Sequence, residues 1–359
     1  MAVAAGAVPL RVAVVGAGVF GRNHLRVYRE LEQAGVAVQL AAVIEPNPEA
    51  RARAEADFGV RGFAAIPECM AWARAELKWI GAASVCVPTV HHAACAVELM
   101  ACGIDLLIEK PIAATLDQAD AILRTARELG RLVQVGHLER FNPAVHAVQP
   151  LIHRPMFFEV HRLSIFTPRS LDVDVVLDLM IHDLDIVMSL VNSPVREVRA
   201  VGLPVLSEKV DIANVRLEFE NGCVANFTAS RVSTERVRKM RFFQPHQYLS
   251  LDFARQDLLL IDVSAAAGMT AAQLAAVAAS SSATLAADHP LADHPSAGLS
   301  LRKVPVTAGE PLRLEIEAFL DAVRTHSQPV VPAEDGRAAL ALALEINAAI
   351  ASHAQRTGL

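Results

Sequence analysis

The sequence contains no continuous apolar run of about 20 residues, so it holds no candidate for a transmembrane helix. It also has no excess of basic residues: 33 Lys and Arg residues stand against 39 Asp and Glu residues, a formal net charge of −6. A general nucleic-acid binder needs a basic surface, and this charge argues against one. With 359 residues, 53% of them hydrophobic and 20% charged, the chain is long enough for two soluble globular domains of ordinary size.

Paired cysteines are missing as well. The five cysteines form no CxxC pair, and no spacing typical of metal ligands stands out. Cys95 and Cys102 lie seven residues apart on one face of a predicted helix, which is typical of a buried stripe. We therefore expect reduced structural thiols in a cytoplasmic protein without a metal. Residues 1–10 are apolar but lack the basic start of a signal peptide, and we interpret them as a short disordered extension.

Residues 10–135 alternate between short apolar strands and helices. Such strands suit a parallel sheet covered on both faces, and repeated βα units form a doubly wound α/β sheet with ligand at the strands' carboxyl ends. We predict an N-terminal Rossmann domain over residues 1–140. The predicted strands are Val12–Val15, Leu40–Ile44, Ala83–Val87, Leu106–Ile108 and Leu132–Val135, and the predicted helices are Asn23–Ala34, Pro48–Phe58, His91–Cys102 and Leu116–Leu129.

Residues 141–359 follow a different pattern, with alternating or β-branched segments around one helix at Val175–Leu190. The pair Asn221-Gly222 is a strong hairpin signal. We predict an α+β domain with a large open, mostly antiparallel sheet. Residues 264–300, rich in Ala and Ser, are interpreted as an irregular, partly helical, mobile insertion. Helical patterns return at Pro311–Arg324 and Ala333–His353, and these helices are expected to pack back on the sheet or on the first domain.

The first chemical motif is Gly16-x-Gly18-Val19-Phe20-Gly21, which follows a strand and opens a helix. Gly16 permits a tight turn, Gly18 lets the backbone approach a pyrophosphate, and Gly21 lets helix and strand pack closely. The positive end of the helix then faces the phosphates. The alternative is a glycine-rich turn without a ligand.

Glu45 ends the second predicted strand, 24 residues after Gly21. A carboxylate at this position accepts hydrogen bonds from the adenosine ribose hydroxyls and repels a 2′-phosphate, which favours NAD over NADP. The alternative is a carboxylate that caps the Pro46-Asn47-Pro48 turn.

The second motif, Glu109-Lys110-Pro111, follows an apolar strand. A lysine at the carboxyl end of such a strand points into the ligand crevice, where its ammonium lowers the pKa of a reacting hydroxyl or positions the nicotinamide. The alternative is a surface lysine paired with Glu109.

The strongest catalytic signal is the spacing of Asp178, His182 and Asp185, which share one face of the predicted helix. A polar stripe on a buried helix is costly unless it faces a site or is internally paired. His182 has the pKa range for proton transfer at neutral pH. The alternative is a histidine held between two carboxylates for structure.

Two further segments follow strands of the first domain and are candidates for binding. Pro88, Thr89 and His92 come after the strand that ends at Val87, and they are predicted to line the cofactor crevice. After the strand that ends at Val135 come three polar candidates for cofactor or substrate binding, which are His137, Arg140 and Asn142.

Together, the glycine-rich turn, Glu-Lys-Pro and Asp-x-x-x-His resemble the glucose–fructose oxidoreductase, inositol dehydrogenase and rhizopine catabolism family, called Gfo/Idh/MocA. The resemblance covers roughly residues 10–260 and the C-terminal helices. It implies a catalytic group of Lys110, Asp178 and His182 in an NAD-dependent dehydrogenase of a secondary sugar hydroxyl. By analogy with the family, the open sheet implies a homodimer or homotetramer.

The segment before Asp178 resembles the nucleotide-sugar members of the family, and it holds the candidate substrate residues Arg162, Thr167, Arg169 and Ser170. This resemblance implies oxidation of the 3-hydroxyl of UDP-N-acetylglucosamine to a 3-keto sugar for lipid A precursor synthesis. The alternatives are a dehydrogenase of free sugars or inositols and a non-catalytic NAD-binding sensor. One departure is Val173–Leu177, where many family members carry glycine.

Overall fold

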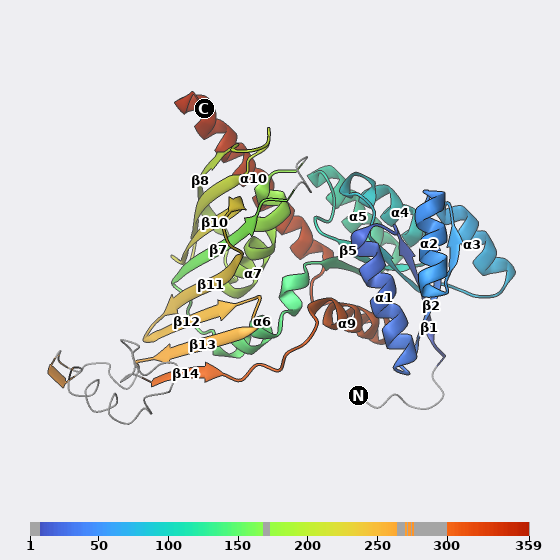
Figure 1. Cartoon of the computed structure of the whole chain (residues 1–359), viewed down its shortest axis with the longest axis horizontal. Coiled ribbons are helices and arrows are strands. Elements are labelled where there is room, and N and C mark those ends of the chain that lie inside the picture. The colour runs from blue at the N-terminus through green and yellow to red at the C-terminus, as the bar shows by residue number, and fades with distance from the viewer. Residues whose placement is uncertain are drawn as a thin grey trace. The chain divides into compact units, whose positions relative to one another are not determined.

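The computed structural model describes residues 8–167, 173–263, 270, 272–273, 275 and 300–358. The chain divides into two compact units. Unit 1 comprises residues 1–141 and 310–341, and unit 2 comprises residues 142–309 and 342–359 (Figure 1). Residues 310–341 thus belong to the same unit as the N-terminal part of the chain. Most of the predicted 264–300 insertion lies outside the described residues.

Unit 1 is built on a six-stranded parallel sheet in the order β3-β2-β1-β4-β5-β6, the strand order of a dinucleotide-binding Rossmann fold. The predicted doubly wound sheet is thereby confirmed. The strands are β1 Leu10–Val15, β2 Val38–Ile44, β3 Arg61–Phe63, β4 Ala82–Val85, β5 Asp105–Glu109 and β6 Val133–Gly136. The helices between them are α1 Val19–Gln33, α2 Pro48–Phe58, α3 Ile66–Ala75, α4 His92–Ala101 and α5 Leu116–Leu129.

Helices cover both faces of this sheet. Helices α1 and α2 contact each other, and α1 also packs against α9, Pro311–Thr325, whereas α3, α4 and α5 pack together in sequence. The shared core on the α1 side contains Leu25 and Leu31 of α1 with Ile316 and Phe319 of α9, all fully buried. The amphipathic face of α9 therefore completes a core that the N-terminal sequence begins.

The edge strand β6 is partly covered by a later segment of unit 1. The amide of Val135 donates to the carbonyl of Val331 at 2.9 Å, and Gln134 forms an antiparallel bridge with Pro332. This pairing satisfies backbone groups that an edge strand otherwise exposes. Helix α10, Ala333–Thr357, begins directly after it and continues into unit 2.

Unit 2 is built on an eight-stranded sheet in the order β14-β13-β12-β11-β7-β10-β9-β8. Its pairs are antiparallel except for β10 with β7, which run parallel. The strands are β7 Phe157–Ile165, β8 Val195–Leu203, β9 Ile212–Phe219, β10 Val224–Ser233, β11 Val237–Gln244, β12 Gln247–Asp252, β13 Asp257–Asp262 and β14 Ser300–Val304. The predicted Asn221-Gly222 hairpin joins β9 to β10, with Gly222 at φ +83°.

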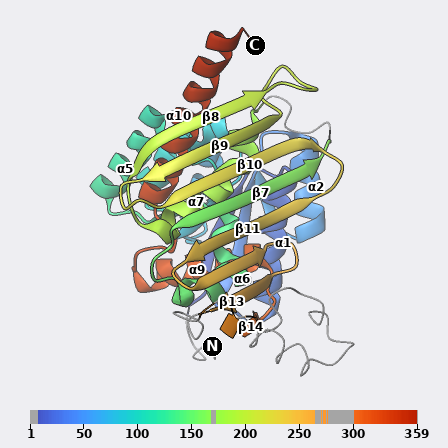
Figure 2. The same ribbon diagram turned by 90° about the vertical axis from the view of Figure 1, so that its left-hand side faces the viewer.

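One face of this sheet carries the helices α6, Pro143–Val148, and α7, Ile181–Val191. Over the opposite face, the part of unit 2 that the structure describes places no helix on the strands (Figure 2). Half-buried aromatic side chains of Phe157 and Tyr248 flank Phe243, with ring centroids 5.9 and 5.0 Å from it. The homo-oligomer expected from the sequence stays a prediction. Of the helices that the structure describes, none combines the length and apolarity needed to cross a membrane.

Candidate active site

The loop between β1 and α1 depends on glycine at two positions. Gly16 has φ +93°, and a Cβ atom there would lie 2.7 Å from the carbonyl oxygen of Cys86. At Gly21 a Cβ atom would lie 1.9 Å from the Gly16 carbonyl oxygen, so only glycine lets α1 pack on the loop. Gly18, by contrast, has no atom within 4 Å of its ideal Cβ position. The backbone at Gly18 is therefore open to a ligand.

The first turn of α1 offers backbone N–H groups to such a ligand. Gly18 is the N-cap and supplies no side-chain hydrogen bond to these groups. Val19 and Phe20 are exposed, at 63% and 48% of their surface. An uncapped helix N-terminus beside an open glycine binds phosphate groups, and these residues fit the pyrophosphate of a dinucleotide.

Glu45 lies at the end of β2, beside this loop. Its Oε2 accepts a hydrogen bond from the amide of Ala17 at 2.7 Å, and its Oε1 accepts one from the amide of Asn47 at 2.9 Å. Helix α2 is capped by Asn47, whose side chain accepts from two amides, so Glu45 is not the cap of that helix. A carboxylate has about four lone-pair sites, and two of them stay available for ribose hydroxyls.

Lys110 follows β5 directly and is half-buried. The residues before and after it, Glu109 and Pro111, each contact a buried histidine. His24 of α1 donates from Nε2 to Glu109 Oε1 at 2.8 Å. His92 of α4 lies 2.9 Å from the carbonyl of Pro111 through Nδ1 and 2.9 Å from the carbonyl of Val87 through Nε2. His92 is 1% exposed, and the prediction that it lines the cofactor crevice stays a prediction.

One group of metal-ligating residue types occurs in this region of the described structure. Atoms of His24, Cys86 and Glu109 lie within 4.8 Å of one another. Both imidazole nitrogens of His24 are already engaged, Nε2 with Glu109 and Nδ1 with Ser84 Oγ at 3.0 Å. Burial, followed by the charge of Glu109, raises the pKa of Cys86 well above its ordinary value, so the thiol keeps its proton. The group is a buried polar network.

The segment after β6 places three predicted binding residues inside the protein. Burial lowers the pKa of His137 to about 3, and the nearby charges of Arg140 and Lys110 act in the same direction, so His137 is neutral at pH 7. Arg140 donates to Asp335 Oδ2 at 2.8 Å. Asn142 caps α6 through the amide of Ala144 and donates to the carbonyl of Phe253. Arg140 and Asn142 each have a structural partner within their own unit.

In unit 2 the segment that carries Asp178 and His182 begins with a turn that was not predicted. Val176–Met180 form a single π-helical turn, and α7 begins at Ile181. The sequence predicted a continuous α-helix from Val175, and this prediction is wrong for the first turn. The residue spacing of an α-helix therefore does not extend from Asp178 to Asp185. Wider turns of this kind occur frequently at functional sites. Asp178 and His182 are half-buried on this segment.

The π turn is held at its start by Asp174. Its Oδ1 accepts from the amides of Val176 and Leu177, each at 3.0 Å, and its Oδ2 accepts from Asn347 Nδ2 at 3.0 Å. The amide of Val175 also donates to the carbonyl of Val210 at 2.9 Å. These bonds fix the approach to Asp178 without the glycines that many family members carry.

Arg162, a predicted substrate residue, is engaged inside unit 2. Its Nε and Nη2 donate to the two oxygens of Asp183 at 2.7 and 2.8 Å, and both side chains are nearly fully buried. The guanidinium also lies over the ring of Phe253, 5.6 Å from its centroid. Sequence reasoning overlooked Asp183, because the sequence does not show which carboxylate a strand arginine meets. Thr167 is exposed, whereas Arg169 and Ser170 lie outside the described residues.

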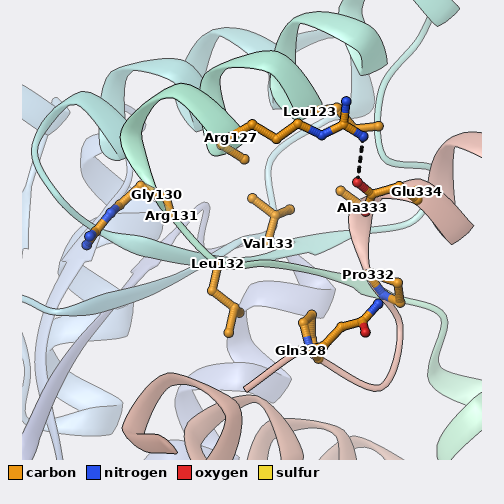
Figure 3. Close-up of a pocket in the computed structure, with 12 residues that line it drawn as sticks. Leu123, Arg127, Gly130, Arg131, Leu132, Val133, Gln328, Pro332, Ala333 and Glu334 are labelled. Atoms are coloured by element: carbon orange, nitrogen blue, oxygen red, sulfur yellow. Dashed lines mark hydrogen bonds and ion pairs between the residues drawn. The ribbon is translucent and has the colours of Figure 1, made fainter. Parts of the chain in front are cut away.

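A pocket of about 370 Å³ lies elsewhere in unit 1, between α5 and the segment that covers β6 (Figure 3). Arg127 and Glu334 lie across it and form an ion pair of 2.8 Å. None of the residues that line it belongs to the predicted site. This pocket is therefore separate from the predicted site residues.

Comparison with known proteins agrees with this geometry. Residues 10–137 match the Gfo/Idh/MocA oxidoreductase family with its NAD-binding Rossmann fold, and residues 117–244 match the C-terminal domain of the same family. A UDP-N-acetylglucosamine 3-dehydrogenase from Acidithiobacillus ferrooxidans is 33% identical over 350 residues, 97% of this chain and 99% of the relative. This chain belongs to the Gfo/Idh/MocA family. It is an NAD(P)-dependent dehydrogenase of CH–OH groups.

Solved structures share this fold over nearly the whole chain. The A. ferrooxidans enzyme has a TM-score of 0.80 at 31% identity, with 96% of this chain and 98% of that chain covered. The WlbA dehydrogenase from Bordetella pertussis, in complex with NADH and UDP-GlcNAcA, has a TM-score of 0.72 at 17% identity, with 98% of each chain covered. An inositol 2-dehydrogenase from Leifsonia xyli subsp. xyli is 28% identical over 197 residues, 53% of this chain and 56% of the relative.

The Arg162–Asp183 pair makes a specific prediction about stability. Arg162→Ala leaves the buried Asp183 carboxylate without its bidentate partner, and we expect the free energy of unfolding to fall by about 3–5 kcal/mol. The double variant Arg162→Met/Asp183→Leu removes both charges and is expected to recover most of this loss. Urea unfolding of the three proteins measures it. Unchanged stability of Arg162→Ala with a raised KM for a nucleotide sugar would instead assign Arg162 to substrate.

Proposed function

We propose that this Gfo/Idh/MocA dehydrogenase oxidises the 3-hydroxyl of UDP-N-acetylglucosamine to a 3-keto sugar with NAD, as a step in lipid A precursor synthesis. The observation that carries this proposal is similarity over nearly the full length of both chains to a UDP-N-acetylglucosamine 3-dehydrogenase. Relatives named inositol dehydrogenases match 52–62% of the chain. The pattern Lys110, Asp178 and His182 supports an enzyme over a cofactor sensor, because a sensor does not need it.

Three residues have separate roles in the proposed reaction. His182 takes the proton of the reacting hydroxyl, and Asp178 orients His182 or binds that hydroxyl. The ammonium of Lys110 donates to the same oxygen and stabilises the negative charge that develops on it. NAD, when bound, accepts the hydride from the carbon that bears this oxygen. Proton and hydride thus leave the same CH–OH group, which becomes a ketone.

The cofactor in this proposal is held by the residues of the β1–α1 loop and by Glu45. Gly16, Gly18 and Gly21 admit the pyrophosphate to the end of α1. Glu45 accepts from the ribose hydroxyls with the lone pairs that the amides of the loop leave available. A 2′-phosphate placed there meets a carboxylate of like charge.

We therefore expect NAD to bind at least about tenfold more tightly than NADP, a difference of about 1.4 kcal/mol. Calorimetric titration of both cofactors measures this ratio. In Glu45→Gln the negative charge is gone while the shape is kept, so the ratio is expected to narrow. Tighter binding of NADP to the unaltered protein would contradict the assignment of Glu45 to the ribose.

The nucleotide in this proposal is bound by donors in the segment before Asp178. Thr167, Arg169 and Ser170 are the candidates, because Arg162 already pairs with Asp183. Arginine recognises a diphosphate through a planar fork of donors. The nucleotide lies far from the reacting carbon, so its binding energy supports positioning of the sugar as well as affinity.

We expect UDP-N-acetylglucosamine to be oxidised with a far higher kcat/KM than free N-acetylglucosamine. The assay follows the appearance of NADH with each sugar, and inositol serves as a third substrate. Equal kcat/KM values for the two glucosamine compounds would show that the nucleotide is not recognised. Preferential oxidation of a free sugar or an inositol would replace the proposed substrate.

His182→Ala is expected to lower kcat by about 10²–10⁴, the usual contribution of a positioned acid–base group. Its affinity for NAD should be nearly unchanged, because His182 belongs to unit 2 and the glycine-rich loop to unit 1. The exposed His153 of unit 2 provides the matched control, and His153→Ala should keep its activity. A near-normal kcat of His182→Ala at saturating substrate would leave His182 a structural residue.

A further inference from the structure

Lys110 has no rigid element of its own after β5 ends at Glu109. The position of its ammonium depends on the residues directly before and after it. Each of these two residues contacts a histidine from a different helix, His24 of α1 or His92 of α4. Both histidines are at most 1% exposed, which is unusual for a residue type of intermediate burial.

His24 holds the side chain of Glu109, the residue before Lys110. The imidazole donates to Glu109 at 2.8 Å through Nε2, and its Nδ1 lies 3.0 Å from Ser84 Oγ. The Ser84 hydroxyl in turn lies 2.9 Å from the hydroxyl of Tyr28, one turn further along α1. Since these partners are buried or nearly so, the ring of His24 has one orientation that satisfies both nitrogens.

Gly136 also lies against Glu109. Gly136 on β6 pairs with Glu109 on β5, and a Cβ atom at Gly136 would lie 3.2 Å from Glu109 Cα and 3.3 Å from its carboxylate. The Glu109 side chain thus occupies the space beside this glycine and extends toward His24. Its rotamer is fixed from both directions.

Two other acidic side chains near Glu109 have raised pKa values. Burial raises the pKa of Glu315 on α9 well above its ordinary value, and the charge of Glu109 acts in the same direction. The pKa of Cys86 is raised by the same two causes. Burial thus disfavours a second negative charge beside Glu109, whose carboxylate accepts the hydrogen bond from His24.

His92 fixes the backbone on the other side of Lys110. Its two nitrogens lie 2.9 Å from the carbonyls of Pro111 and Val87, which follow β5 and β4. Burial lowers the pKa of His92, while the carbonyls and Glu109 oppose that effect. Either neutral tautomer donates to one of these carbonyls, and the protonated ring donates to both. The ring thus connects the loops at the ends of two neighbouring strands.

We propose that His24 and His92 are positioning residues that fix the place and direction of the Lys110 ammonium, one through Glu109 and the other through Pro111. The inference rests on the proposed catalytic role of Lys110. Because His24 lies on the helix that begins at the glycine-rich loop, it also links the cofactor-binding helix to the lysine. A displacement of about 1 Å at a reacting group costs on the order of 100-fold in rate, so loss of either contact should be measurable in kcat.

Substitution of each histidine by glutamine or asparagine tests its two ring nitrogens separately. Glutamine places its NH₂ group near the position of Nε2, and asparagine places it near Nδ1. At position 24, His24→Gln therefore keeps the donor to Glu109, and His24→Asn keeps only the contact with Ser84. At position 92 the order is reversed, because His92→Asn keeps the donor to Pro111 and His92→Gln keeps the donor to Val87.

We expect His24→Gln and His92→Asn to keep kcat within about threefold, and His24→Asn and His92→Gln to lose about 10–100-fold, with KM little changed in all four. The exposed His153 supplies the control pair, since His153→Asn and His153→Gln should both match the unaltered protein. Thermal unfolding of each variant is measured in parallel. A loss of kcat that follows the loss of stability, whichever donor is kept, would overturn the proposal.

A second readout needs no substrate. The chain has five lysines, so reductive ¹³C-methylation gives few signals, and Lys110→Arg identifies the signal of Lys110. This signal should shift in His24→Asn and His92→Gln and stay in place in His24→Gln and His92→Asn. If the unaltered protein oxidises the sugar and no variant moves the signal, the positioning role fails and the proposed function stands. If the protein oxidises no sugar and the signal follows this pattern, the proposed function fails and the positioning role stands.

Discussion

The close approach of α1 to the Gly16 carbonyl is the constraint on which unit 1 depends. A Cβ atom at Gly21 would lie 1.9 Å from that oxygen, so the helix reaches this position only because residue 21 has no side chain. From there α1 buries Leu25 and Tyr28 in the core and brings His24 within 2.8 Å of Glu109. The open glycine-rich turn and the contact beside Lys110 are thus consequences of the same packing.

Unit 2 contains two buried pairs of oppositely charged side chains. Asp183 lies against Arg162, and Asp211 lies 3.4 Å from Arg231, whose guanidinium also donates to the carbonyl of Val173. Burial opposes ionisation of Asp211, but hydrogen bonds from three amides and the Ser207 hydroxyl hold its pKa at about 2. Val173, in the segment that leads to Asp178, is therefore held by an arginine that is itself paired with the buried Asp211.

The sequence predicted elements best where it contains local signals. Helices Pro48–Phe58 and Leu116–Leu129 have their predicted ends, because Asn47 or Thr115 caps the start and a glycine in the left-handed region follows the end. The strands β3, β11, β13 and β14 were not predicted. The three residues of Arg61–Phe63 are too few to show a period, and Val237–Gln244 carries polar residues on the uncovered face of its sheet. The π turn was missed because its wider hydrogen bonds leave no periodic pattern in five residues.

By itself the sequence determined the Rossmann unit, the glycine-rich loop, Glu45 and the motif around Lys110, because each depends on residues close together in the chain. The tertiary structure alone decided which polar side chains serve as internal partners. Arg140 meets Asp335, Arg162 meets Asp183 and His24 meets Glu109 across 195, 21 and 85 residues of chain. The local pattern around such residues is the same whether they bind a substrate or a buried charge. Only the folded chain brings a partner within hydrogen-bonding distance, and a buried charge is stable only where that partner is present.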